Sequence, residues 1–450
     1  MEKKERCVDM TQGSAFRHVI SFTIPLLIGN LFQQFYNLVD SLVVGNFVGA
    51  NALAAVGTCG SLGYLIFSLS SGLSVGLGVM AAQAFGARNH KEIRKIIANG
   101  IYILSGAGLI VSVLFYALAP SLLRLLRAPD TILPEAVTYL RLICLGTVAV
   151  ALYNGIAAIL RAMGDSKTSL YFLIIASMVN VVLDLLFVVG FGMGVLGVGL
   201  ATLISQMISF VISLIYALTK VPCFRLNKQE LRPEGKTILR ALNLGIPVAA
   251  QSSIISVSTM VLQGVVNGFG ETVMAAYTVV DRVEQIVQQP YNSVGTALTS
   301  FSGQNVGAQK LDRVKQGFQA AAWMALGFSL TLLPIVYLFG NQIVGVFVKD
   351  PQVIAIGARG MRINCLFYFA LGMIYIPRSI LNGAGDSSFA MINGLTEVAC
   401  RVIYSNVFTR IPAIGFWGIW ITTGFTWSTT AAVCLHRYFR GKWRTMFDKG

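Results

Sequence analysis

The sequence predicts an all-α polytopic membrane protein, built as two parallel six-helix repeats around a central cavity. Three observations support this fold class: a low share of charged residues, a succession of long apolar runs, and a repeat that relates the two halves of the chain. Of the 450 residues, 55% are hydrophobic and only 12% are charged. A soluble domain carries about a quarter charged residues. This composition cannot cover a surface that faces water.

The apolar runs are long enough to cross a bilayer, which takes roughly 20 residues of helix. By this length rule the sequence predicts twelve transmembrane helices. They cover about residues 18–44, 52–80, 96–118, 133–160, 169–191, 195–218, 240–266, 272–300, 318–346, 354–380, 388–409 and 414–437.

The two halves of the chain repeat each other at an offset of 221 residues. LRAMGDS at 160–166 aligns with LNGAGDS at 381–387, and GVLGVGLAT at 194–202 aligns with GFWGIWITT at 415–423. Three further patches follow the same offset to within about a residue. Each repeat holds an even number of spans, so both insert the same way up, with a substrate path between them.

This repeat predicts the division of the chain. We expect an N-lobe at 1–220, a cytoplasmic linker at 221–239 and a C-lobe at 240–450 that ends in a basic tail. The linker is polar and basic, and it is interrupted by Pro222 and Pro233.

The net charge of +15 follows the predicted topology. Lys and Arg gather before the first span, in the linkers that follow even-numbered spans, and in the C-terminal tail. Such an excess marks the cytoplasmic side. We therefore expect both termini in the cytoplasm, a multi-pass protein of the inner (plasma) membrane in contact with lipid, and no nucleic-acid partner.

The sequence predicts that the protein is not an enzyme and needs no cofactor. The seven cysteines are scattered without a C-x-x-C pair, and no Walker A motif occurs. GLSVG at 72–76 matches G-x-S-x-G, but it lies in an apolar run with no histidine at that depth, so we interpret it as small-residue helix packing. GAGD at 383–386 falls in a turn that both repeats share.

Five of the nineteen acidic residues fall inside predicted spans. Charges at membrane depth are rare and usually face a cavity or a partner. These five are Asp40, Asp184, Asp281, Glu284 and Glu397.

The first repeat carries a candidate cation site. Asn180 and Asp184 share one helix face in the fifth span, and Asp40 shares a face with Gln33 and Asn37 in the first. Thr202 lies in the sixth span among small residues. The second repeat has no acid at the positions equivalent to these residues, which are approximately Val261 or Leu262, Arg401, Ser405 and Thr423.

This asymmetry favours a functional site over a structural interhelical hydrogen bond, which is the alternative interpretation. A carboxylate withdrawn from water can hold or release a proton as its surroundings change. Two carboxylates with an amide and a hydroxyl also supply the oxygen ligands that a small cation prefers. The residues leave H⁺ and Na⁺ both open as the bound ion, and they predict no structural metal.

The second repeat carries a different polar set. Asp281, Glu284 and Gln288 share one face of the eighth span, and Glu397 and Arg401 are spaced for an intrahelical pair in the eleventh. This set is either an ion-pair network that closes the lobe or a polar wall for a substrate, which Gln251 of the seventh span would join.

Pro25 and Pro247 fall inside apolar runs, where proline permits a kink. We interpret Pro25 as a hinge. The hypothesis is that protonation of Asp40 changes the bend of the first span. A fixed packing kink is the alternative.

Twelve spans in two parallel repeats, an early Ile-Pro in each repeat, NLVDSLVVG in the first span and MGD after the fourth together resemble the multidrug and toxic compound extrusion (MATE) family, closest to its DinF-like branch. The resemblance covers essentially the whole chain. It implies a cation-coupled antiporter that exports amphipathic, often cationic small molecules by alternating access. In that branch the N-lobe cation site matches Asp40, Asn180, Asp184 and Thr202.

The resemblance also implies a substrate cavity and a monomeric transporter. The candidate cavity residues are Gln33, Gln34, Tyr36, Asn37, Tyr153, Gln251, Asp281, Glu284, Gln288, Glu397 and Arg401. The candidate wall aromatics are Phe35, Tyr36, Tyr153, Tyr277 and Tyr291. The nearest alternative is a flippase for a lipid-linked precursor, and an intramembrane hydrolase and a channel or receptor are further alternatives.

Overall fold

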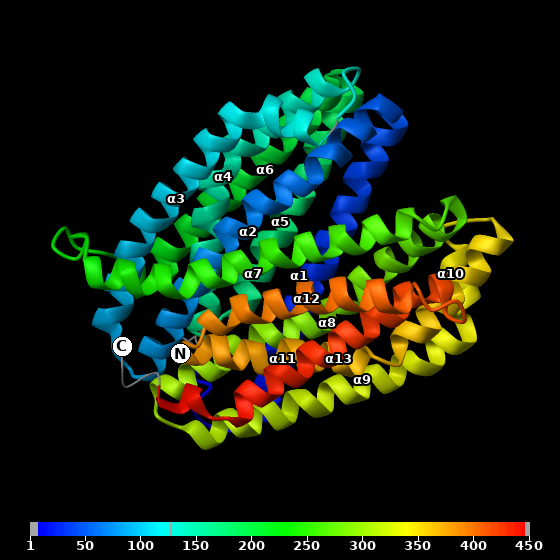
Figure 1. Cartoon of the computed structure of the whole chain (residues 1–450). Coiled ribbons are helices and arrows are strands. Elements are labelled where there is room, and N and C mark those ends of the chain that lie inside the picture. The colour runs from blue at the N-terminus through cyan, green and yellow to red at the C-terminus, as the bar shows by residue number, and fades with distance from the viewer. Residues whose placement is uncertain (1–7, 127, 446–450) are drawn as a thin grey trace. The chain divides into compact units, whose positions relative to one another are not determined.

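The computed structural model describes residues 8–126 and 128–445, and the regular structure of these residues is helical throughout (Figure 1). The long helices of the first half are α1 (Ala15–Val43), α2 (Ala50–Gly86), α3 (His90–Leu125), α4 (Leu133–Ala162), α5 (Ser166–Asp184) and α6 (Gly194–Lys220). Those of the second half are α7 (Gly235–Asn267), α8 (Glu271–Gly307), α9 (Leu311–Gly345), α10 (Pro351–Cys365), α11 (Tyr368–Ala384), α12 (Ser388–Phe408) and α13 (Gly418–Phe439).

These helices form twelve spans when α10 and α11 are counted as one bent span. Eight helices in the described ranges are long and apolar enough to cross a membrane by themselves, and the α10–α11 pair, bent by 49°, makes a ninth. The remaining three, α8, α12 and α13, carry more polar or charged residues. The predicted tenth span at 354–380 is therefore a broken helix.

The chain forms two compact units whose boundaries fall inside helices. Among the described residues, unit 1 comprises residues 8–9 and Pro25–Ala249, and unit 2 comprises Met10–Ile24 and residues 250–445. Each unit thus includes the N-terminal part of the other repeat's first helix. The division predicted from the repeat places residues 10–24 and 240–249 differently.

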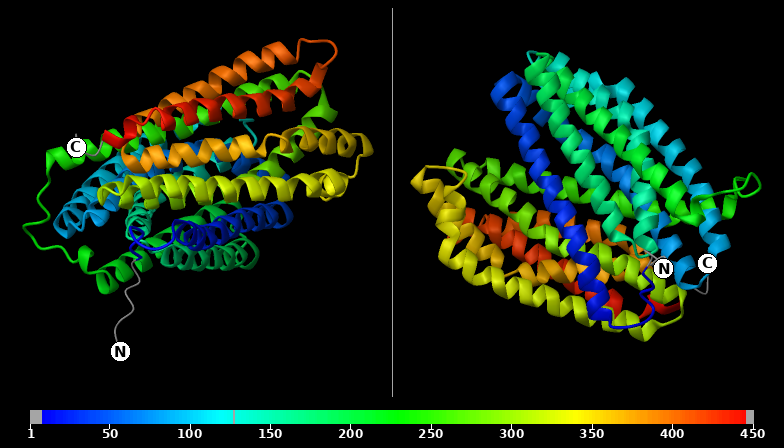
Figure 2. Two further views of the ribbon diagram at one scale, coloured as in Figure 1. Left: turned by 90° about the horizontal axis from the view of Figure 1, so that it is seen from below. Right: turned by 180° about the vertical axis from the view of Figure 1, so that it is seen from behind.

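The proline positions coincide closely with these boundaries. Helix α1 passes from unit 2 to unit 1 at Pro25. Helix α7 passes from unit 1 to unit 2 after Ala249, two residues beyond Pro247. Both helices continue through their prolines, and Figure 2 shows α1 as one long ribbon.

Unit 1 contains a close seam between α2 and the first half of α7. A Cβ atom added at Gly72 would lie 2.5 Å from the backbone nitrogen of Ala249, and one added at Gly76 would lie 2.8 Å from that of Gly245. Glycine is required here because the backbones approach so closely. The GLSVG stretch is therefore helix packing, as the sequence analysis interprets it.

The linker before α7 is fixed to α3 within unit 1. Arg94 donates two hydrogen bonds to the Glu230 carboxylate, at 2.8 and 3.1 Å. Tyr102 Oη donates to the Leu231 carbonyl at 2.7 Å, and the Glu234 amide donates to Asn99 Oδ1 at 2.8 Å. A hydrogen bond from the Asn227 amide and then the contact with Arg94 lower the pKa of Glu230.

A comparable set of hydrogen bonds fixes the segment before α1 within unit 2. The Met10 amide donates to Gln304 Oε1 at 2.9 Å. Arg313 donates to the carbonyls of Met10 and Gly13, at 2.9 and 2.8 Å, and Lys310 Nζ donates to the Thr11 carbonyl at 2.9 Å. Met10 is 1% exposed, so this segment is part of the packed structure.

We call the end of unit 1 that carries the α2–α3 turn, the α4–α5 turn and the linker its basic end, because Arg88, Arg94 and Lys95 lie there. Asp165 caps α5 at this end by accepting from the Thr168 amide at 3.0 Å.

Candidate functional site

The two acids of the first repeat meet inside unit 1. Asp40 of α1 and Asp184 of α5 lie within hydrogen-bonding reach of each other. Asp184 is 1% exposed and Asn180, one turn earlier on α5, is 3% exposed. Asp40 Oδ1, both Asp184 oxygens and Asn180 Oδ1 are buried and accept no hydrogen bond from any described residue. Buried polar atoms are normally satisfied, so this cluster is built to receive a ligand or a proton.

Both acid-bearing helices change their winding within one turn after the acid. A π-helical segment at Val44–Val48 follows α1, and another at Leu185–Gly190 follows α5 immediately after Asp184. The two segments contact each other. Such turns are rare and are frequent at functional sites, and they give the predicted site a feature that the sequence did not signal.

Two tyrosines lie near the acid pair. Tyr36 of α1 and Tyr139 of α4 are close enough to interact electrostatically with both Asp40 and Asp184. Tyr36 is among the predicted cavity residues, whereas sequence reasoning missed Tyr139, which lies in an ordinary apolar span.

Thr202 of α6 lies at the depth of the acid pair. Thr168 of α5 contacts Tyr216 of α6, with 3.2 Å between their hydroxyl oxygens. Antiparallel helices of equal rise then place Thr202 level with residue 182, between Asn180 and Asp184. This straight-helix geometry brings Thr202 near that level, but its hydroxyl bonds to neither Asp184 oxygen, so its part in cation coupling stays a prediction.

The remaining predicted N-lobe cavity residues take different positions. Gln33 and Gln34 are half-buried, and Asn37 is exposed on α1. Tyr153 of α4 lies beside Ser209 of α6 and near Arg161, on the basic side of the acid pair.

In unit 2, Gln251 and Glu284 are engaged by asparagines that the sequence analysis did not single out. Gln251 Nε2 donates to Asn393 Oδ1 at 2.8 Å. Asn364 of α10 donates to Glu284, and both side chains are buried.

The other polar residues predicted in the second repeat also have partners within unit 2. Asp281 accepts from Gln285 at 2.8 Å, and Gln288 accepts from the Tyr375 hydroxyl at 3.2 Å. Glu397 and Arg401 form a buried ion pair at 3.0 Å, as their spacing predicts. These contacts favour the internal network over the polar wall, and a substrate role for this set stays a prediction.

The predicted wall aromatics divide by exposure. Phe35 is 63% exposed. Tyr291 is 2% exposed, and its hydroxyl lies 2.7 Å from Ser329 Oγ. Tyr291 therefore belongs to the interior of unit 2, because its hydroxyl finds a partner between α8 and α9. Tyr277 is half-buried.

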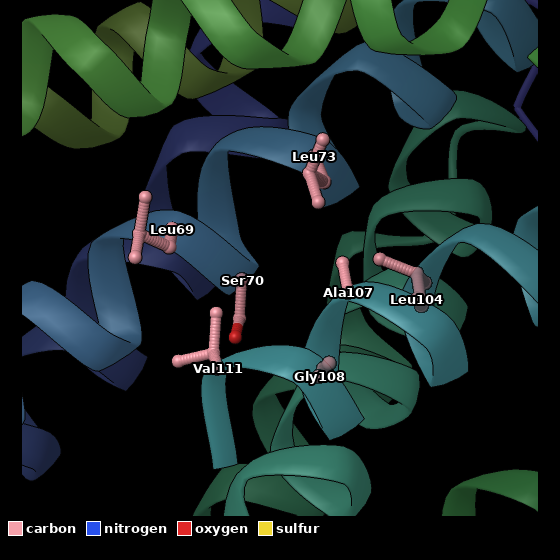
Figure 3. A pocket seen from close by; sticks show the side chains of 8 residues that line it. Leu69, Ser70, Leu73, Leu104, Ala107, Gly108 and Val111 are labelled. Carbon is pink, nitrogen blue, oxygen red and sulfur yellow. The ribbon is translucent and has the colours of Figure 1, made fainter. Parts of the chain in front are cut away.

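A small cavity in unit 1 lies away from all these residues. It has a volume of about 20 Å³, and Figure 3 shows Leu73 of α2 and Leu104, Ala107 and Gly108 of α3 around it. Its lining is almost wholly apolar. A space of this size and character has no room for an organic cargo and no partners for a cation.

No group of three or more His, Cys, Asp or Glu side chains gathers anywhere in residues 8–126 and 128–445. Asn180 Oδ1, one turn before Asp184, is a further buried oxygen without a hydrogen-bond partner in this cluster. One pair of carboxylates suits a proton or a monovalent cation better than a divalent metal, which takes more charged ligands.

Comparison with known proteins adds the family context. Residues 25–186 and 247–406 both match the family model described as MatE. The chain is 29% identical over 443 residues to the probable multidrug resistance protein YpnP of Bacillus subtilis, with 98% of each chain covered. It is 24% identical to the probable multidrug resistance protein NorM of Thermotoga maritima, covering 95% of this chain and 93% of NorM.

The fold also matches a solved structure over nearly its whole length. A MOP superfamily transporter from Pyrococcus furiosus superposes with a TM-score of 0.92 at 23% identity. The reversed polarity of that transporter's binding pocket is said to suggest a different function. The match covers 99% of both chains.

Proposed function

The chain belongs to the MatE family of membrane transporters, and from this premise we propose that it is a cation-coupled antiporter that exports amphipathic, often cationic small molecules by alternating access. The coupling ion is H⁺ or Na⁺, taken at Asp40, Asn180, Asp184 and Thr202. Relatives named as multidrug resistance proteins support the class of cargo.

The observation that carries this proposal is the buried Asp40–Asp184 pair in unit 1. Asp40 Oδ1 and both Asp184 oxygens are withdrawn from water and accept no hydrogen bond from the described chain. Two carboxylates cannot both stay charged at this separation without a cation or a proton. Cation binding and cargo binding then exclude each other when the ion changes the charge and shape of the lobe.

The polar set of unit 2 serves stability in this proposal. Gln251, Glu284 and Glu397 each have a buried partner on another turn or another helix. We place the protein as a monomer in the plasma (inner) membrane with both termini and the basic end in the cytoplasm, since Lys and Arg concentrate there.

The test is efflux of a fluorescent organic cation from liposomes that contain the purified protein, under an imposed pH gradient or an imposed sodium gradient. Efflux driven by one gradient and lost in Asp40→Asn is expected. The matched control is Ser405→Asn, at the repeat position of Asp184 in unit 2, which should keep at least half the wild-type rate.

Flux without any gradient dependence, equal in wild type and Asp40→Asn, would overturn the proposal. It would favour the flippase alternative, which the names of the relatives do not support. Movement of a labelled lipid-linked precursor in the same liposomes would then be measured.

A further inference from the structure

Polar side chains, some buried and some half-buried, lie in a line along α5 and α6 from the acid pair to the basic end of unit 1. Thr168 of α5 meets Tyr216 of α6 at that end, and Ser209 of α6 lies beside Tyr153 of α4. On α6 the hydroxyls recur every three or four residues, which is about 5 Å along a helix. They belong to Thr202, Ser205, Ser209, Ser213 and Tyr216. On α5 the corresponding polar groups are those of Thr168, Ser169, Ser177, Asn180 and Asp184.

Several members of this line are buried without a hydrogen-bond partner. Ser209 is 5% exposed and Ser169 is 6% exposed, and neither Oγ atom bonds to any described residue. The Asn154 amide nitrogen of α4 is also buried without a hydrogen-bond partner. These three groups lie between the acid pair and the basic end. Like Asp40 Oδ1 and both Asp184 oxygens, they lack hydrogen-bond partners in the described chain, and water molecules would satisfy them.

The spacing fits water. Two hydrogen bonds in series, each of about 2.8 Å, span about 5.6 Å, and this matches the distance between successive hydroxyls on one helix face. The whole line extends over 16 residues of α5, from Thr168 to Asp184, or about 24 Å.

At the basic end the line reaches a small hydroxyl network. Thr168 Oγ1 donates to Asp165 Oδ2 at 2.6 Å, and Tyr216 Oη lies 3.4 Å from the same oxygen. Asp165 is itself 6% exposed.

The second repeat replaces this network by an ion pair. The residues 221 positions after Asp165, Thr168 and Tyr216 are Asp386, Phe389 and Arg437. Arg437 donates two hydrogen bonds to the Asp386 carboxylate, at 2.7 and 3.0 Å, and its guanidinium lies over the Phe389 ring. Arg437 and Phe389 thus stand where unit 1 has the hydroxyls of Tyr216 and Thr168, so unit 2 lacks the hydroxyl network of this turn.

We propose that the α5–α6 hydroxyl line of unit 1 is a hydrated proton path between the Asp40–Asp184 pair and the basic end, with Asp165, Thr168 and Tyr216 at its mouth. This inference rests on the proposed function and deepens it, because it makes the coupling ion a proton. Each water or hydroxyl accepts a proton from one neighbour and passes its own to the next, so one positive charge crosses. Each group then turns back to its first orientation before the next proton passes. Besides the acids, the groups that face the line are Tyr36, Tyr139, Tyr153 and Arg161.

The test compares Ser209→Val with Thr430→Val in liposomes. Thr430 holds the equivalent repeat position on α13, is 0% exposed and also has an unpartnered hydroxyl, so it is a matched control. Two rates are measured: proton movement coupled to cargo, with a trapped pH dye, and exchange of labelled for unlabelled cargo, which needs no ion passage.

Ser209→Val should slow the proton-coupled rate at least tenfold and leave cargo exchange unchanged, and Thr430→Val should alter neither. Tyr216→Phe, which removes one hydroxyl at the mouth, should slow the proton-coupled rate several-fold. Equal proton-coupled rates in wild type and Ser209→Val would overturn the path. Transport driven only by sodium, with no proton movement, would also overturn it and leave the proposed antiporter intact.

Radiolytic hydroxyl labelling checks for the water independently of transport. Tyr153 and Tyr216 should be labelled in the wild type and labelled less in Ser209→Val. Absence of labelling at both tyrosines in wild-type protein that exports cargo normally would refute the path alone. Wild-type protein with neither exchange nor gradient-driven flux would refute the proposed function and this inference together.

Discussion

Glu397 and Arg401 are charged side chains held at membrane depth by each other. They pair at 3.0 Å across one turn of α12, and both are more than nine-tenths buried. Removing one partner of a buried pair leaves the other charge uncompensated, which costs about 3–5 kcal/mol.

Arg401→Met should therefore lower the thermal unfolding midpoint of the detergent-purified protein strongly, and Glu397→Leu with Arg401→Met should recover most of the loss. The double variant leaves neither member of the pair without its partner. A single variant as stable as the wild type would mean that the pair does not support unit 2.

The residue scale is also where the sequence predicts most about the site. Asp40, Asn180 and Asp184 are identifiable because a charge or an amide in an apolar run needs a reason. Tyr139 is not, because an uncharged tyrosine in a span is ordinary. Asn364 is also an amide inside a predicted span, but it is not singled out in the sequence analysis. Only the packing of α4 on the acid pair and of α10 on Glu284 gives these two a role.

At the scale of the element, the seam between α2 and α7 depends on the lack of side chains. A methyl group at Gly72 would meet Ala249 at 2.5 Å, whereas one at Gly57 or Gly60 of the same helix would meet nothing within 4 Å.

Gly72→Ala should thus lower the unfolding midpoint by several degrees and reduce efflux, because α2 and α7 must separate. Gly57→Ala and Gly60→Ala should be neutral or slightly stabilising, since alanine is favoured over glycine in a helix by roughly 0.5–1 kcal/mol. Thermal melting of the three variants checks this. Similar melting of all three would contradict a close seam.

The hydrogen bonds that fix the linker to α3 should stabilise it in a pH-dependent way. The folded-state pKa of Glu230 lies below its ordinary value, because the Asn227 amide and then Arg94 stabilise the carboxylate. A group with a lowered folded-state pKa stabilises the structure above its unfolded pKa, about 4.3 for glutamate, and the contribution is lost as pH falls through the folded value.

Hydrogen–deuterium exchange of residues 222–234, corrected for intrinsic rates, should show constant protection from pH 8 to pH 5 and a loss below about pH 4. Glu230→Gln should show reduced protection already at pH 7. The control is Asp312→Asn, which removes an exposed pair with Lys315 elsewhere. Protection in Glu230→Gln equal to that of the wild type would remove the ion pair as the cause.

Elements differ in how far a sequence can predict them. The long spans follow from apolar run length, and α10–α11 is the exception: its bend falls around Leu366 and Phe367, where no proline or glycine marks a break. The π-helical segments after Asp40 and Asp184 are not predicted either, because the glycines in VGNFV and LLFVVG indicate a weak helix end without specifying a π-helical turn.

On the scale of the whole molecule, the division of α1 at Pro25 bears on the hinge hypothesis. The two sides of this proline belong to different compact units. A proline inside a helix removes one backbone hydrogen bond and makes bending easier.

Pro25→Ala should slow gradient-driven efflux several-fold and leave the unfolding midpoint equal or higher. Pro120→Ala is the matched control, since Pro120 also lies inside a helix, α3, but within one unit. Unchanged coupled efflux in Pro25→Ala would leave the fixed-kink interpretation.

The repeat predicts two equal halves, and the units depart from this at both first helices. Alignment of LRAMGDS with LNGAGDS says which segments are related and nothing about which lobe each one packs on. The exchange of residues 10–24 and of the first half of α7 depends on contacts such as Arg313 with Gly13 and Gly76 with Gly245, and these are visible only in three dimensions.

This exchange has a consequence for how the protein is made. Met10 leaves the ribosome 294 residues before Gln304, its hydrogen-bond partner. The segment before α1 therefore waits through synthesis of the whole first repeat. Conversely, a nascent chain that stops at residue 220 leaves Gly72 and Gly76 uncovered, since α7 does not yet exist. Neither unit is built from one repeat alone, and unit 1 is completed only when the first helix of the second repeat has been synthesised.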